Sequence, residues 1–190
     1  MIGQKPAPLQ VFPLEIRLRP AGHQKETVAP VDLLRRAGVE VVMASITSSI
    51  HVTGRCGITL HADAVLEGLE ASGFDLLLIP GGPGVKGLRE DGRAAALAKD
   101  FATIGKPVAA ICAAPTVLKD AGLLDERRYT SHAGVRGEIT ASLPDERVVT
   151  DRGVITSQGA GTAVEFGLVL VEHLCGTEKR REVEAGIMLA

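Results

Sequence analysis

The residue with the strongest chemical signal is Cys112, which lies where an apolar run ends and a helical pattern begins. The run 108–111 predicts a strand, and Pro115 suits the first turn of the following helix. Ala110 and Ala114 are small, as the tight turn of a nucleophile elbow requires. A helix that begins just after Cys112 lowers the pKa of the thiol. The pattern predicts a nucleophile, and a buried structural cysteine is the alternative.

Two further features can assist such a thiol. His132 follows a short predicted β run, and an imidazole there can orient the sulfur or transfer a proton, although a loop histidine is often a surface residue. Gly81 and Gly82 end another apolar run, where backbone N–H groups can bind an oxyanion, and a plain tight turn is the alternative. Neither G-x-G-x-x-G nor G-x-x-x-x-G-K-[ST] occurs, so both nucleotide-binding fingerprints are absent from the sequence.

The other cysteines and histidines favour structural roles. His51, Cys56 and His61 lack the close ligand pairs of zinc motifs, so we expect no metal site. The three cysteines are odd in number and widely spaced, which favours free thiols in a reducing compartment. For Cys56 and Cys175, packing is the favoured interpretation.

The composition is that of an ordinary globular protein. Of the 190 residues, 45% are hydrophobic and 23% charged, with a formal net charge of -2. That charge and an aromatic share of 3% argue against binding to nucleic acid. No apolar run approaches the roughly 20 residues of a membrane span, and residues 1–13 do not resemble a signal peptide. We therefore expect a cytoplasmic protein that does not bind membranes.

Apolar runs alternate with helical patterns along the chain, which predicts an α/β fold with a mostly parallel sheet in one domain, 1–190. Strands are expected at 39–44, 74–79, 107–111 and 153–157, the middle two central because they are continuously apolar. Helices are expected at 27–37, 64–69, 91–104, 114–119, 162–174 and 178–188. A hairpin is expected within 47–60. The segment 14–19 alternates charged and apolar residues, which suits an edge strand.

Four motifs occur in the order and spacing of a known family. They are Glu26 to Gly38, Ile79-Pro80-Gly81-Gly82, Ala109 to Pro115, and Thr156 to Ala163. On these motifs, residues 22–189 resemble the ThiJ/PfpI superfamily, in the subgroup of the Parkinsonism-associated DJ-one deglycases and their bacterial relatives. The resemblance implies a flavodoxin-like three-layer α/β/α sandwich, usually a homodimer, without a cofactor or metal.

The resemblance also implies roles for individual residues. It assigns the reactive cysteine to Cys112, the conserved acid to Glu26, the site histidine to His132 and the backbone donors to Gly82 and Ala113. A protonated Glu26, its pKa raised by burial and by the thiolate, would donate a hydrogen bond to the sulfur and hold it as thiolate.

The sequence departs from the family pattern at three places. Cys56 stands where relatives often carry the Arg of a hairpin motif on the dimer side of the site, and Ala160 replaces the Pro of a Gly-Pro-Gly-Thr loop. Residues 22–25 replace the start of a Gly-x-Glu-Glu segment while Glu26 is kept. The first two departures bear on ligand preference and the third on how Glu26 is placed.

The resemblance implies a glutathione-independent glyoxalase or protein deglycase, in which Cys112 attacks methylglyoxal, glyoxal or their adducts and Glu26 and His132 move protons. The alternative is a redox sensor or redox-regulated chaperone in which Cys112 is oxidised. A protease is disfavoured because Ala113 stands where that branch carries His. A glutamine amidotransferase is disfavoured because no acid follows His132 closely.

Overall fold

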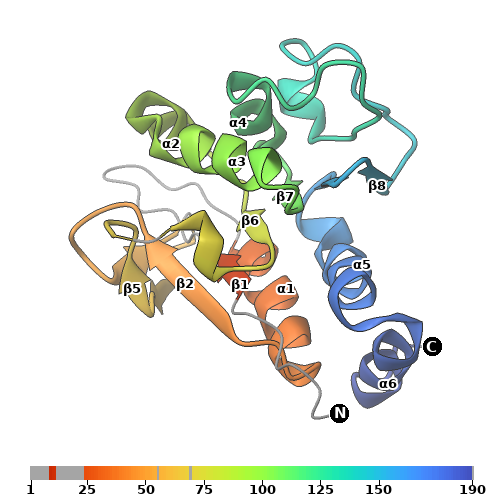
Figure 1. The fold of residues 1–190 in the computed structure, drawn as a ribbon. Coiled ribbons are helices and arrows are strands. Elements are labelled where there is room, and N and C mark those ends of the chain that lie inside the picture. The colour runs from red at the N-terminus through yellow and green to blue at the C-terminus, as the bar shows by residue number, and fades with distance from the viewer. Residues whose placement is uncertain (1–8, 12–23, 55, 69, 190) are drawn as a thin grey trace.

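A computed structural model describes residues 9–11, 24–54, 56–68 and 70–189 (Figure 1). Seven strands form one sheet in the order β5-β2-β1-β6-β7-β9-β8. Their bounds are Leu9–Val11 (β1), Val41–Ser45 (β2), Ala64–Val65 (β5), Leu77–Ile79 (β6), Val108–Ile111 (β7), Val148–Asp151 (β8) and Val154–Ser157 (β9). Every neighbouring pair is parallel except β8 and β9. The predicted α/β class and mostly parallel sheet are therefore confirmed.

Helices cover both faces of this sheet. One face carries α1 (Gln24–Arg36), α5 (Ala163–Cys175) and α6 (Thr177–Gly186), and the other carries α2 (Val85–Asp91), α3 (Arg93–Thr103) and α4 (Pro115–Asp120). The chain also contains three short 3₁₀ helices, Ala71–Gly73 (η1), Ala133–Val135 (η2) and Ala160–Thr162 (η3). The arrangement is the expected flavodoxin-like three-layer sandwich, with a separate antiparallel hairpin of β3 (His51–Thr53) and β4 (Thr59–His61).

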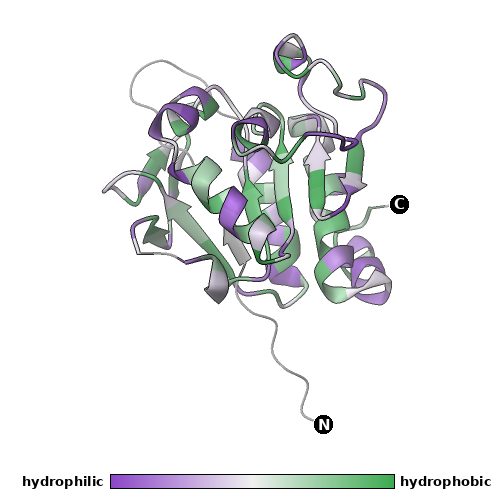
Figure 2. Cartoon of the chain, turned by 45° about the horizontal axis from the view of Figure 1, so that its top comes forward, coloured by the Kyte–Doolittle hydropathy of each residue, from purple (hydrophilic) through white to green (hydrophobic). Residues whose placement is uncertain are grey.

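The two faces of β6 explain its continuously apolar sequence. Leu76 and Leu78 pack into the core under α1 and α5, whereas Leu77 and Ile79 pack into the core under α2, α3 and α4. All four side chains are fully buried, and Figure 2 shows the apolar strands enclosed between the helices. A strand covered on both faces needs apolar residues at every position, which is why the sequence predicted a central strand here.

Two sequence predictions about secondary structure are wrong. The helix expected at 64–69 is absent, because Ala64 and Val65 pair in parallel with Ala44 and Ser45 as β5. A segment this short gains few helical hydrogen bonds, and the edge of the sheet offers it backbone partners on β2 instead. The helix expected at 91–104 begins later, because Gly92 takes a left-handed φ of 78° and separates α3 from α2, a helix that was not predicted.

The chain around the predicted histidine also differs from expectation. Residues 128–131 form no strand, and hydrogen bonds from Thr130 hold this segment instead, one to Thr156 Oγ1 at 2.9 Å and one to the Leu143 carbonyl at 2.7 Å. The strand expected at 14–19 lies outside the described residues. The position between β2 and β6 is occupied by β1.

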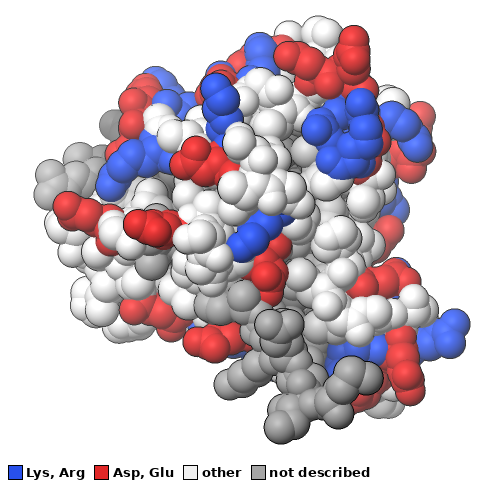
Figure 3. Space-filling model, in the orientation of Figure 1, with Lys and Arg blue, Asp and Glu red and all other residues white. Residues whose placement is uncertain are grey.

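Acidic and basic side chains lie interspersed over the face of the molecule in Figure 3. Within the described ranges, no helix has the length and apolar character needed to cross a bilayer.

Candidate active site

Cys112 lies between the end of β7 and the start of α4, in a strained turn. Its φ is 66°, a left-handed value that is uncommon for residues other than glycine. Two backbone hydrogen bonds hold this conformation: the Cys112 N–H donates to the Ser157 carbonyl at 2.9 Å, and the Cys112 carbonyl accepts from the His132 N–H at 2.8 Å. The side chain is only 5% exposed. The geometry is that of a nucleophile elbow, at the place where the sequence predicted one.

Glu26 meets Cys112 from the first turn of α1. Its side chain is fully buried, and glycine at position 81 lets the two groups approach each other. A Cβ on Gly81 would lie 2.4 Å from Cys112 Cβ and 2.6 Å from Glu26 Oε2, closer than real contacts allow. The thiol and the N–H groups of Gly81 and Ala160 lower the Glu26 pKa, but neither Glu26 oxygen has a partner at normal hydrogen-bond geometry.

The two acids shift each other's ionisation. Burial raises the pKa of Glu26 to about 7, which is the expected direction, but the Cys112 side chain lowers this pKa, contrary to the expectation. Burial, and then the charge of Glu26, raise the pKa of the Cys112 thiol to about 12, whereas the sequence had predicted a lowered value. The helix N-terminus does not outweigh desolvation beside a second acid. Near neutral pH the pair therefore carries at most one negative charge.

The predicted backbone donors occupy two different places. The N–H groups of Gly82 and Ala113 lie near the sulfur and lower the thiol pKa, so they face an anion formed on Cys112. The N–H of Gly81 acts instead on the Glu26 carboxyl. The N–H groups of Gly82 and Ala113 can thus stabilise negative charge at the sulfur, whereas Gly81 permits the close approach of Glu26 and Cys112.

His132 reaches the same site from the N-terminus of η2. Its Nδ1 accepts a hydrogen bond from the Gly134 N–H at 3.0 Å, which assigns the proton of a neutral ring to Nε2. A Cβ on Gly159 would lie 3.6 Å from His132 Cδ2, 3.7 Å from Glu26 Oε1 and 3.9 Å from Cys112 Cβ. All three predicted side chains thus converge on one glycine of the loop after β9.

A cavity of about 410 Å³ opens beside this cluster, which we call the Glu26 cavity. It is lined by Glu26, His132, Ala133, Arg136, Arg147, Gln158, Gly159, Ala160, Gly161 and Thr162. Ala160 was a sequence candidate, whereas Arg136 and Arg147 were not, since no spacing rule locates loop arginines. Cys56 is exposed between β3 and β4 and does not line the cavity.

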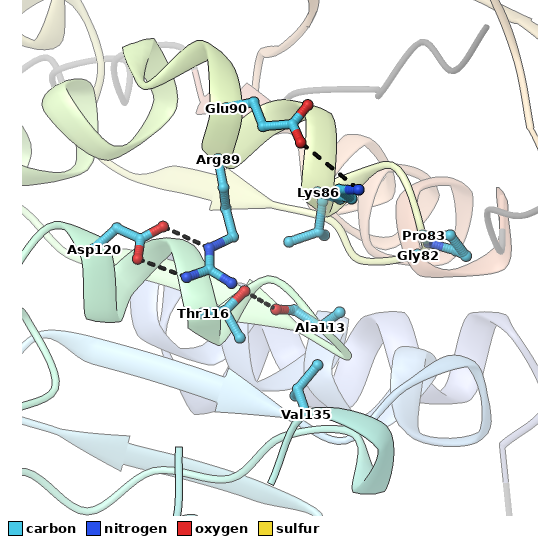
Figure 4. Close-up of a pocket in the computed structure, with 10 residues that line it drawn as sticks. Gly82, Pro83, Lys86, Arg89, Glu90, Ala113, Thr116, Asp120 and Val135 are labelled. Carbon is cyan, nitrogen blue, oxygen red and sulfur yellow. Dashed lines mark hydrogen bonds and ion pairs between the residues drawn. The ribbon is translucent and has the colours of Figure 1, made fainter. Parts of the chain in front are cut away.

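A second cavity, of about 490 Å³, lies between α2, α4 and η2 (Figure 4). Gly82 and Ala113 line this second cavity, whereas Glu26 and His132 line the Glu26 cavity. The two cavities thus lie on different sides of Cys112. Arg89 lines this cavity. Its guanidinium donates two hydrogen bonds to Asp120, at 2.6 and 2.8 Å, and two to Glu138, at 2.6 and 2.9 Å. These carboxylates occupy the Arg89 guanidinium, so it has little capacity left for a ligand.

The histidines of the β3–β4 hairpin are the next candidates for metal ligands. His51 and His61 face each other across the β3–β4 hairpin, with ring centroids 4.6 Å apart. Among residues that the structure describes, no three His, Cys, Asp or Glu side chains are grouped as a metal site.

Comparison with known proteins agrees with this geometry. Residues 18–173 match the DJ-1/PfpI family. The chain belongs to this family. A glutathione-independent glyoxalase of Caenorhabditis elegans is 38% identical over 169 residues, covering 87% of this chain and 89% of that protein. A deglycase of Pyrococcus abyssi is 35% identical over 139 residues, covering 72% and 83%.

Solved structures show the same relationship. The crystal structure of Drosophila melanogaster DJ-1beta matches with a TM-score of 0.87 at 31% identity. The match covers 97% of this chain and 99% of that one. The three-layer sandwich is therefore that of the DJ-1/PfpI fold.

Proposed function

We propose that this DJ-1/PfpI protein is a cysteine-dependent, glutathione-independent glyoxalase and protein deglycase. Its substrates are methylglyoxal, glyoxal or their adducts. The observation that carries the proposal is the interaction of Cys112 with the buried Glu26 carboxyl, which lines an open cavity together with His132. The relatives named as a glyoxalase and a deglycase support the same chemistry.

Addition to the substrate begins at the sulfur. Cys112 Sγ adds to the aldehyde carbon of methylglyoxal, and the carbonyl oxygen takes the proton that the Cys112–Glu26 pair held, which forms a hemithioacetal. The N–H groups of Gly82 and Ala113 stabilise the oxygen while it carries negative charge.

Rearrangement then moves hydrogen and electrons within the bound substrate. Glu26, as carboxylate, removes the proton from the former aldehyde carbon while His132 Nε2–H protonates the oxygen of the neighbouring carbon, which gives an enediol. Glu26 then returns its proton to the neighbouring carbon, and the hydroxyl group on the first carbon returns its proton to His132 as it becomes the thioester carbonyl. The first carbon is oxidised and the second is reduced, which leaves a lactoyl thioester on Cys112. Water cleaves the thioester, and the products are lactate, a proton and the free enzyme. No external oxidant or reductant is needed.

The direct test is lactate formation from methylglyoxal without glutathione. We expect many turnovers per wild-type chain, and a loss of at least about a thousandfold in Cys112→Ala and Glu26→Gln, because each removes a group that acts on the reacting atoms. Cys175→Ala is the matched control, since that cysteine lies at the end of α5. It should keep wild-type turnover. Wild-type protein without turnover, or full activity in Cys112→Ala, would rule the proposal out.

A further inference from the structure

The Glu26 cavity holds unusual hydrogen-bonding groups. Among the described residues, three buried side-chain polar atoms lack a hydrogen-bond partner: both oxygens of Glu26 and Nε of Arg136. All three belong to residues that line this one cavity. Buried polar groups are normally satisfied, and a charged donor without a partner is costly. The Glu26 oxygens lie close to the Cys112 thiol and to the N–H groups of Gly81 and Ala160, so the Arg136 guanidinium is the group in this cavity that most lacks a partner.

Arg136 gives that molecule a charge preference. Its Nη2 contacts only carbonyl oxygens, those of Ser131 at 3.2 Å and Pro144 at 3.4 Å. Within the described ranges no carboxylate pairs with it. Arg89, in the other cavity, is by contrast held by two carboxylates. The charge of Arg136 is thus available to a ligand.

Arg147 lies on the same wall, where Glu165 already pairs with its charge, so it supplies fixed N–H groups rather than a free charge. Its Nε pairs with Glu165 at 2.6 Å, and its Nη2 donates to the Gly161 carbonyl at 3.3 Å, so the guanidinium is fixed beside the loop that carries Gly159. Glu26 is the only carboxylate that lines the described cavity, and burial keeps it largely protonated below about pH 7. The lining therefore favours an anion.

The size of the cavity indicates where the anionic group belongs on the ligand. About 410 Å³ lies within the usual range of ligand pockets and exceeds what a three-carbon dicarbonyl fills. A reactive carbonyl near Cys112 and Glu26 leaves room for a larger attached part at the arginine wall.

We propose that Arg136 and Arg147 form an anion-binding subsite that selects dicarbonyl adducts bearing a carboxylate or phosphate group. The acidic group accepts from the Arg136 guanidinium, of which Nη2 alone makes hydrogen bonds among the described residues, and the carbonyl or hydroxyl end of the adduct points toward Glu26 and Cys112. The selection of adducts rests on the proposed glyoxalase and deglycase function, whereas anion binding itself does not.

Two adducts that differ only in charge test the selection. Methylglyoxal forms hemithioacetals with N-acetylcysteine, which carries a carboxylate, and with N-acetylcysteine amide, which is neutral. We expect wild type to process the carboxylate adduct with a kcat/KM higher by about tenfold or more, the value of a hydrogen bond to a charged group. Arg136→Gln should bring the ratio of the two kcat/KM values to about one, through a rise in KM for the carboxylate adduct, whereas Arg136→Lys should keep part of the preference.

Arg128→Gln is the matched control. It removes the same charge from a side chain that is 68% exposed and lies outside the cavity, so the preference should persist. An equal kcat/KM for the two adducts in wild type, or an unchanged ratio in folded Arg136→Gln and Arg136→Lys, would overturn the subsite.

A binding measurement separates this subsite from the proposed reaction. The Nε–H signal of Arg136, assigned in NMR spectra by its loss in Arg136→Gln, should shift when acetate or inorganic phosphate is added to wild-type protein. A shift with acetate indicates a carboxylate ligand, and a shift with phosphate alone indicates a phosphorylated one. No shift with either anion would contradict the subsite. A shift without turnover of either adduct would keep the subsite and reject the glyoxalase and deglycase function.

Discussion

At Cys112 and Glu26, burial decides which protons are held. Two acids in contact under the protein surface cannot both ionise easily, because each charge opposes the other and water is excluded. Burial raises the pKa of both groups, and the charge of Glu26 raises that of the thiol further, while the thiol itself lowers the pKa of Glu26. Reactivity of the cysteine therefore depends on the position of one proton within the pair, rather than on a freely ionised thiolate.

The Glu26 proton also links stability to pH. The folded protein holds it with a pKa of about 7, compared with the ordinary value of 4.5, so the free energy of unfolding should fall as pH rises from 4.5 to 7. Glu26→Gln cannot ionise. We compare Cys112→Ala, which removes the coupled thiol, with the double variant that also carries Glu26→Gln. At about pH 8 we expect the double variant to have a free energy of unfolding higher by roughly 2–3 kcal/mol, and near pH 4 we expect the two proteins to be equally stable.

Urea unfolding across that pH range measures the difference between the two proteins. A gain in stability that is the same at all pH values would show that the carboxyl is not buried as a proton-holding group.

Among the elements, the contact of α1 with α5 matters most for the site, because α1 carries Glu26. Gly167 of α5 lets the two helices approach closely: a Cβ there would lie 2.9 Å from Pro30 Cα and 2.7 Å from Leu33 Cδ1. The backbone atom of Pro30 cannot yield as a flexible side chain can. The position of Glu26 thus depends on a glycine far from it in sequence.

Gly167→Ala should force α1 and α5 apart. We expect the free energy of unfolding to fall by about 1–3 kcal/mol, the usual cost of overpacking, and methylglyoxal turnover to fall with it as Glu26 moves away from Cys112. Gly87→Ala in α2 is the control, since its Cβ meets nothing within 4 Å. That variant should be as stable as wild type or more so. Equal effects of the two substitutions on turnover would contradict the role of the α1–α5 contact.

The elements that sequence predicted well are those fixed by local pattern. The strand before Cys112 and the helix after it follow from an apolar run and a proline, so the elbow was predictable from residues 108–116. The segment 64–69 failed because pairing with β2 depends on a neighbour distant in sequence. Arg136 and Arg147 escaped prediction for a similar reason, since tertiary structure brings their loops to Glu26.

The resemblance supplied what local pattern lacked. It implied that Glu26 and His132 belong beside Cys112, and the structure places both there. It did not indicate the raised pKa of the thiol, which depends on the depth at which the two acids are buried together.

In the whole molecule, the site lies at the edge where the parallel strands end. The segments after β6, β7 and β9 supply Gly82, Cys112 and Gly159, and α1 brings Glu26 to them. Sheets of this class bind ligands at the carboxyl ends of their strands. The site is thus assembled from segments spread over most of the chain.

The exposed face of α1 bears on assembly. Val28 is 44% exposed and Ile58 is 54% exposed, and Gln24 Nε2 joins α1 to the hairpin through a 2.7 Å hydrogen bond to the Ile58 carbonyl. We propose that this apolar surface pairs two copies of the chain as a homodimer. Sedimentation velocity should show a dimer for wild type and a larger monomer fraction for Val28→Lys. A wild-type monomer at all concentrations would contradict the proposal.

The most direct test of the account is the fate of Cys112 during turnover. Protein mixed with methylglyoxal, quenched within one turnover and digested for mass spectrometry should carry one substrate-derived group on Cys112, which disappears as lactate forms. The adduct should be absent from Cys112→Ala and should persist longer in Glu26→Gln. An unmodified Cys112 during lactate formation, or adducts confined to surface lysines and arginines, would contradict a cysteine nucleophile. Stable oxidation of Cys112 by peroxide in a protein that forms no lactate would instead indicate a redox sensor.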